Sequence, residues 1–241
     1  MTKKRQSSKV FADRLTVLDP VAQRVIDTLI TTANAQRAQL LKRYLPQLPA
    51  LLMGRSINFK EKMSFYDDKL LPIDREQGEL LYMLLRSRGG QCAVEFGTSF
   101  GVSSIYLAAA IRDSQTGGRL IGTEMVAAKV VSARANIAAA GLSTYAEVRE
   151  GDARLTLLNL ACEVDFLLLD GWPTLAMDIL RLVEPKLSNN AIVVLDNVGH
   201  FRGNLRSLTN YLKEDRRYVV SELPLHGGMI IAIFKKSCPQ L

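Results

Sequence analysis

The stretch that most constrains the fold runs from Cys92 to Gly101 and reads CAVEFGTSFG. It begins as an apolar run, reaches an acid at Glu95, and continues into a turn that carries Gly97 and Gly101. A helical pattern follows at 102–112. A strand, a tight loop and a helix within about 20 residues are typical of the first unit of an open α/β sheet. The glycines let the backbone pass close to a ligand, and the free N–H groups of the helix start point to the same place.

Strand and helix patterns alternate along the rest of the chain, as a doubly wound fold requires. Further strands are predicted at 119–124, 145–149, 164–169, 191–195, 218–223 and 229–234, and further helices at 127–140, 174–187 and 204–213. The last two strands are joined by a short loop without a helix, which makes them an antiparallel pair. We therefore predict a Rossmann-like, doubly wound, mostly parallel seven-stranded α/β sheet with a C-terminal antiparallel hairpin.

Before this sheet lies a basic segment, residues 1–62, with a helical pattern and no strand signal. It holds 12 Lys or Arg and 4 Asp or Glu, whereas the rest of the chain holds 19 and 20. We predict two parts: 1–62, a helical cap or the arm of a homodimer, and 63–241, the main domain. The basic excess could attract nucleic acid, but a solvated helix face explains it more simply, so we expect no nucleic-acid partner. A second capped helix begins after Asp74, because Gln77 completes a capping box.

Composition bounds the environment of the protein. The 241 residues are 48% hydrophobic, which suffices for one sizeable core. No apolar run is long enough for a membrane helix, and the basic start leads into no apolar signal core, so we expect neither a membrane nor export. Cys92, Cys162 and Cys238 share no metal-ligand spacing. We predict that they are reduced thiols in a cytoplasmic protein.

Acidic residues stand at or next to the ends of five predicted strands: Glu95, Glu124, Asp152, Asp170 and the pair Asp196-Asn197. Any one of them could be an ordinary cap or turn residue. In open α/β sheets, however, ligands bind beyond the carboxyl ends of the strands, so together these residues predict one site. A dinucleotide loop of the form G-x-G-x-x-G is absent, which disfavours a nicotinamide oxidoreductase. Glu95 would lie near where the phosphate of a dinucleotide belongs, and a carboxylate there suits a ligand that has hydrogen-bond donors, or a cation.

The segment Glu95-Phe-Gly-Thr-Ser-Phe-Gly101 resembles the first motif of the class I methyltransferases, E/D-x-G-x-x-x-G, whose cofactor is S-adenosylmethionine. The resemblance implies that Glu95, Gly97 and Gly101 shape the cofactor loop. It also implies that Gly97, Ser99 and Ser103 lie along the methionine moiety.

The same resemblance assigns the nucleoside half of the cofactor. Glu124 ends the second predicted strand and would accept the ribose hydroxyls, with Met125 beside the adenine. Asp152-Ala153 follows the third strand and would contact the adenine. Trp172, the only tryptophan, would flank the adenine or fill the core.

Two further stretches, LLLDGW at 167–172 and VVLDNV at 193–198, resemble the metal-ligand segments of cation-dependent, catechol-type O-methyltransferases. This resemblance, over about residues 70–236, implies that Asp170, Asp196 and Asn197 hold Mg²⁺ or another divalent cation, with Asp170 also facing the cofactor. Mg²⁺ prefers oxygen ligands, and a hydroxyl bound to it loses its proton more easily. The implied reaction is methyl transfer to a hydroxyl of a small catechol-like aromatic or polyhydroxylated metabolite.

One position departs from that family. A lysine general base usually stands three residues after the first metal aspartate, and here the residue is Pro173. His200 and His226 fall at the same edge of the predicted sheet and are the candidate catalytic substitutes, although loop histidines are more often solvated. Three alternatives stay open: a metal-independent methyltransferase of a small molecule, a methyltransferase that binds RNA through 1–62, and a non-catalytic protein that binds the cofactor.

Overall fold

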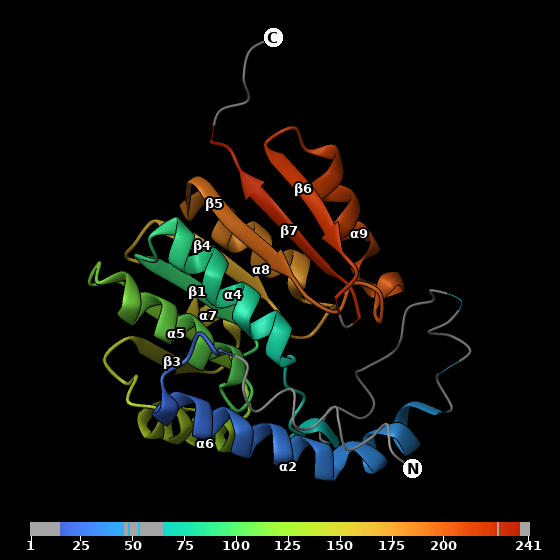
Figure 1. Cartoon of the computed structure of the whole chain (residues 1–241). Coiled ribbons are helices and arrows are strands. Elements are labelled where there is room, and N and C mark those ends of the chain that lie inside the picture. Colours follow the sequence, from blue (N-terminus) through green and yellow to red (C-terminus); the bar gives the residue numbers. More distant parts are fainter. Residues whose placement is uncertain (1–14, 46–47, 49–52, 54–64, 226, 237–241) are drawn as a thin grey trace.

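The computed structural model describes residues 15–45, 48, 53, 65–225 and 227–236. Its centre is a seven-stranded sheet in the order β3-β2-β1-β4-β5-β7-β6 (Figure 1). The strands are β1 (Cys92–Phe96), β2 (Arg119–Glu124), β3 (Ala146–Glu150), β4 (Val164–Leu169), β5 (Leu187–Leu195), β6 (Tyr218–Leu223) and β7 (Met229–Phe234). Strands β1 to β5 pair in parallel, and β7 runs antiparallel between β5 and β6. The predicted fold is confirmed.

Helices cover both faces of the sheet. They are α2 (Pro20–Tyr44), α4 (Arg75–Arg88), α5 (Val102–Ser114), α6 (Ala127–Ala139), α7 (Ala153–Thr156), α8 (Ala176–Val183) and α9 (Arg202–Glu214), with a 3₁₀ turn at Glu184–Lys186. Helices α4, α5 and α6 lie on one face, and α7, α8 and α9 lie on the other (Figure 1). Helix α8 ends earlier than predicted, because Pro185 lacks the N–H that a continuing helix needs.

Strand β4 illustrates why the central strands read as uninterrupted apolar runs. All six of its residues are buried, because a parallel strand in this position is covered by helices on both faces. Phe166 and Leu168 pack with the α4–α5–α6 layer, whereas Leu167 and Leu169 pack with the α8–α9 layer. Because β4 pairs in parallel with both β1 and β5, the carboxyl ends of the three strands lie at the same edge of the sheet.

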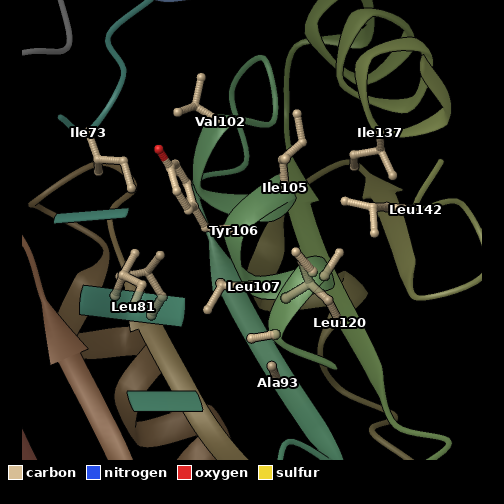
Figure 2. Packing of buried hydrophobic residues seen from close by; sticks show 14 of the residues in the cluster. Ile73, Leu81, Ala93, Val102, Ile105, Tyr106, Leu107, Leu120, Ile137 and Leu142 are labelled. Carbon is tan, nitrogen blue, oxygen red and sulfur yellow. The ribbon is translucent and has the colours of Figure 1, made fainter. Parts of the chain in front are cut away.

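The core between α4, α5 and the sheet is closely packed. Figure 2 shows Leu81, Tyr106 and Leu107 gathered above Ala93 of β1, and all four side chains are buried. Gly78 of α4 lies directly against the ring of Tyr106, and a Cβ at this position would collide with the ring. The absence of a side chain at Gly78 therefore permits the close approach of α4 to α5.

The predicted capping box of α4 is confirmed. The Asp74 carboxylate accepts a hydrogen bond from the Gln77 N–H (2.8 Å), and the Gln77 side-chain oxygen accepts one from the Asp74 N–H (3.0 Å). This exchange satisfies two N–H groups that a helix start leaves without partners. It also fixes the direction of the Gln77 amide, which extends toward the end of β5.

Helix α2 packs across α5 and α6 of the same chain. Ala22 and Ile26 are fully buried in this contact, and the Asp19 carboxylate pairs with Arg112 of α5 (2.5 Å). Much of the predicted N-terminal segment lies outside the described residues. The homodimer and the division at residue 62 stay predictions. Within the described ranges, no helix has both the length and the apolar character needed to cross a membrane.

The cysteines differ from expectation. A disulfide joins Cys92, the first residue of β1, to Cys162 in the loop before β4. The prediction of reduced thiols is therefore wrong for these two residues, because β1 and β4 are neighbours in the sheet although 70 residues separate the cysteines in sequence. Cys238 lies outside the described residues, and the cytoplasmic location stays a prediction.

Candidate active site

The loop after β1 turns sharply at the edge of the sheet. Gly97 has φ +102°, and a Cβ built on it would lie 2.6 Å from the backbone nitrogen of Gly171, in the loop after β4. Only glycine tolerates both the left-handed backbone and this close approach. Gly101 (φ +89°) precedes the first turn of α5. The loop is thus wedged against the end of β4, at the point where the strand order reverses and open α/β sheets bind their ligands.

Glu95 lies beneath this loop and not in the open part of the site. It is fully buried, and its Oε2 accepts hydrogen bonds from the hydroxyls of Thr98 (2.9 Å) and Ser104. Burial raises the pKa of Glu95, partly offset by hydrogen bonds from Ser103 and its neighbours. Glu95, Gly101 and Ser103 do not line the cavity at the carboxyl ends of β1, β2, β4 and β5. Sequence reasoning missed Thr98 and Ser104, whose spacing from Glu95 carries no familiar motif.

Glu124 ends β2 and borders the loop from the other side. Its Oε2 accepts a hydrogen bond from the Ser99 N–H (2.9 Å), and its Oε1 accepts one from the Val126 N–H (2.9 Å). Each oxygen keeps further accepting capacity, since an ionised carboxylate offers about four lone-pair sites. The carboxylate therefore both holds the loop and can accept donors from a ligand.

A cavity of about 490 Å³ opens at the carboxyl edge of β1, β2, β4 and β5. Nine of the predicted site residues line it: Gly97, Ser99, Glu124, Met125, Ala153, Asp170, Trp172, Asp196 and Asn197. Asp152 does not line it; its carboxylate instead caps α7 and pairs with Arg154. The cavity is also lined by Tyr66, Asp67 and Lys129, which sequence reasoning did not select. The ring of Tyr66 meets that of Trp172 edge to face, with centroids 5.5 Å apart.

Asp170 and Asp196 stand at the ends of the adjacent strands β4 and β5. The Asn197 amide bridges them, donating to Asp170 Oδ1 (3.1 Å) and to Asp196 Oδ2 (3.0 Å). Gln77 donates to Asp196 Oδ1 (2.7 Å) from the first turn of α4. Burial raises the pKa of both carboxyl groups, and for Asp170 the charge of Asp196 raises it further. Two buried carboxylates this close favour either a shared proton or a cation.

The donor set can be tested for a metal. Two carboxylates and one amide supply oxygen ligands of the kind Mg²⁺ prefers, once the Asn197 amide turns its oxygen toward the pair. No group of three His, Cys, Asp or Glu side chains in the described part of the chain is arranged to hold a metal ion. The oxygen chemistry of the three residues suits a hard cation, but the described residues show no metal site, so the divalent cation stays a prediction.

Of the two candidate histidines, the structure describes only His200, which does not line the cavity. His200 Nδ1 lies 3.3 Å from Asn197 Oδ1, on an exposed turn whose backbone bonds to the loop before β7 through Val198 N–H and Gly228 C=O (3.0 Å). His226 lies outside the described residues. Pro173, by contrast, faces the cavity beside Trp172.

The central part of the chain matches a known protein family. Residues 94–198 match the model of a family described as a methyltransferase domain. No curated protein matches the chain. The match covers the loop after β1, the ends of β2, β3 and β4, and the Asp196-Asn197 pair.

Solved structures match nearly the whole chain. The O-methyltransferase from Bacillus cereus in complex with S-adenosylhomocysteine is 20% identical, with a TM-score of 0.66 over 88% of this chain and 91% of that one. TomG from Streptomyces achromogenes, an O-methyltransferase in complex with S-adenosylmethionine, is 21% identical, with a TM-score of 0.69 over 98% and 99%. The Podospora anserina methyltransferase PaMTH1, bound to S-adenosylhomocysteine, is 17% identical, with a TM-score of 0.68 over 98% and 96%. At these identities the likeness establishes the fold.

Proposed function

We infer that this chain, whose residues 94–198 form a methyltransferase domain on a class I fold, is an S-adenosylmethionine-dependent O-methyltransferase. The observation that carries the inference is one cavity bordered by two distinct sets of groups. The Gly97 loop and Glu124 form one side, and the Asp170–Asp196–Asn197 cluster forms the other. The first set suits a nucleoside with hydroxyl donors, and the second suits an oxygen-bearing acceptor.

On the cofactor side, we propose that Glu124 accepts the ribose hydroxyls and that Met125 packs against the adenine. Both line the cavity, and Glu124 is oriented by two backbone N–H groups before any ligand arrives. Such preorientation favours binding, because less freedom is lost when the ligand arrives. The Gly97 loop presents backbone without side-chain obstruction.

On the acceptor side, we propose that Asp170, Asp196 and Asn197 hold a divalent cation and that Gln77 orients Asp196. When bound, such an ion accepts oxygens from vicinal hydroxyls and lowers the pKa of the reacting one. The described lining around the cluster is apolar and aromatic, with Trp172, Pro173 and Phe201, which suits a planar ring. Transfer forms an O–CH₃ bond, breaks the S–CH₃ bond, and leaves S-adenosylhomocysteine. His200, whose Nδ1 lies 3.3 Å from Asn197 Oδ1, and His226 stay our predicted acceptors of the released proton.

The experiment is isothermal titration of the protein with S-adenosylhomocysteine, and then with caffeic acid as a catechol, with and without Mg²⁺. We expect the catechol to bind only when Mg²⁺ is present, and Asp196→Asn to abolish this binding while S-adenosylhomocysteine still binds. Asp178→Asn, an exposed acid on α8, is the matched control and should leave both affinities unchanged. Failure of wild-type protein to bind S-adenosylhomocysteine would refute the proposal as a whole.

A metal-independent methyltransferase is the second candidate. Two observations favour it: Asn197 and Gln77 already donate to three of the four oxygens of the aspartate pair, and Pro173 replaces the lysine. Methyl transfer that survives EDTA would identify this case. Cofactor binding together with catechol binding that does not depend on Mg²⁺ would lead to the same conclusion.

A further inference from the structure

Lys129 is placed unusually for a lysine. It lies in the first turn of α6, only 8% of its surface is exposed, and it lines the same cavity as Glu124 and Asp67. Lysine is almost never this deeply buried unless its charge is paired. Neither the sequence motifs nor the family resemblance assigns it a role.

The ammonium group has no hydrogen-bond acceptor among the described residues. Its Nζ lies over the ring of Phe100, 5.6 Å from the ring centroid. Burial lowers the pKa of Lys129, and the negative charges of Glu124, Asp67 and Asp68 act against this effect, in that order. Lys129 Nζ is not one of the buried side-chain atoms that lack a partner, so the ammonium is accessible from the cavity that Lys129 lines. The position therefore points to an acceptor that a ligand brings.

The chemistry of that acceptor follows from Glu124. Both of its oxygens accept backbone N–H groups and can still accept donors from a ligand. A ribose hydroxyl that donates to Glu124 keeps two lone pairs on its own oxygen. A cationic donor in the same part of the cavity complements those lone pairs, and hydrogen bonds with a charged partner are stronger than neutral ones.

We propose that Lys129 is a cofactor-binding residue whose ammonium donates hydrogen bonds to the ribose hydroxyl oxygens of S-adenosylmethionine, opposite the Glu124 carboxylate. This inference rests on the proposed function. It assigns the ribose a donor as well as an acceptor from the protein. It also gives a role to a lysine that lies in the cavity wall without a hydrogen-bond acceptor among the described residues.

The test compares two ligands and three proteins by isothermal titration. The ligands are S-adenosylhomocysteine and its 2′,3′-dideoxy analogue, and the proteins are wild type, Lys129→Met, and the exposed control Lys186→Met. We expect Lys129→Met to weaken S-adenosylhomocysteine about tenfold to a hundredfold, the factor that corresponds to a charge-assisted hydrogen bond. The dideoxy analogue should bind wild type and Lys129→Met equally, and Lys186→Met should behave as wild type with both ligands.

Two outcomes would overturn the inference. Equal affinity of wild type and Lys129→Met for S-adenosylhomocysteine would mean that the ammonium makes no contact with the cofactor. An equal loss for both ligands would mean that Lys129 acts elsewhere, for example by holding Asp67 and Asp68. If the methionine variant does not fold, Lys129→Gln replaces it, with a several-fold loss expected for S-adenosylhomocysteine alone. Wild-type protein that binds neither ligand would refute the proposed function instead.

Discussion

Substitution of Gly97 by alanine should damage both the fold and the cofactor site. Two separate effects act at this position. The backbone has φ +102°, outside the left-handed region that L-residues occupy at about +50° to +70°. The added Cβ would also lie 2.6 Å from the nitrogen and the Cα of Gly171, which are backbone atoms that cannot rotate away.

The two effects can be given magnitudes. A non-glycine residue in a sparsely populated backbone region costs about 1–3 kcal/mol. Overpacking that forces backbone shifts adds typically about 1–3 kcal/mol. We therefore expect Gly97→Ala to lower the free energy of unfolding by about 2–5 kcal/mol. The loops after β1 and β4 would have to separate, which would move the Ser99 N–H away from Glu124. Affinity for S-adenosylhomocysteine should fall at least about tenfold.

Gly141→Ala is the matched control. Gly141 also has positive φ (+72°), but a Cβ there would meet nothing within 4 Å. It should therefore cost only about 1 kcal/mol, with no loss of affinity. Urea denaturation and isothermal titration of both variants measure the two quantities. If Gly97→Ala destabilises no more than Gly141→Ala, and binds S-adenosylhomocysteine as wild type does, the reasoning about the collision with Gly171 is wrong.

Three further predictions concern other parts of the molecule. Gly78→Ala should destabilise the fold by about 2–4 kcal/mol, because its Cβ collides with the buried ring of Tyr106; urea denaturation close to wild type would contradict the packing argument. The Arg217 guanidinium, 2.6 Å from Asp215, lowers the pKa of that carboxyl to about 2. Its stabilising effect is therefore complete above the unfolded pKa near 4 and is lost as pH falls toward 2, so Asp215→Asn should lower the unfolding free energy by about 1–2 kcal/mol at pH 7 and by less at pH 3. Trp172→Ala should weaken caffeic acid or S-adenosylhomocysteine about tenfold in titration, with Trp172→Phe retaining most of the affinity, since the aromatic contact with Tyr66 is lost only in the first.

The edge of the sheet that carries the site could be predicted because parallel strands share a direction. An acid after each apolar run in the sequence becomes an acid at the same edge, and this placed Glu124, Asp170 and Asp196 correctly at the cavity. The contact of Gln77 with Asp196 could not be predicted, because 119 residues separate them. The capping box explains the orientation of Gln77 only locally. Its second role becomes visible when α4 is packed against β5.

The error about the cysteines has the same cause, because residues far apart in sequence become neighbours only in the folded sheet. Spacing along the chain tests for metal ligands or for redox pairs close in sequence, and Cys92 and Cys162 are neither. They meet because β4 pairs with one side of β1, whereas β2 and β3, which come between them in sequence, lie on the other side of β1. The adjacency is a property of strand order, which no local pattern contains.

Glu95 belongs to the first motif but supports the loop from beneath and does not line the cavity. Its carboxylate is turned under the loop, where the hydroxyls of Thr98 and Ser104 donate to one of its oxygens. Gly122 of β2 lies alongside, and a Cβ there would collide with the Thr98 hydroxyl and lie 3.2 Å from Glu95 Oε2. The acid therefore needs a small neighbour on the adjacent strand as well as hydroxyl donors on the loop. Together these residues hold Thr98 in place, and the loop beyond it then directs the Ser99 N–H to Glu124. We therefore expect the loop backbone and Glu124 to contact a ligand, and Glu95 to affect binding through the shape of the loop.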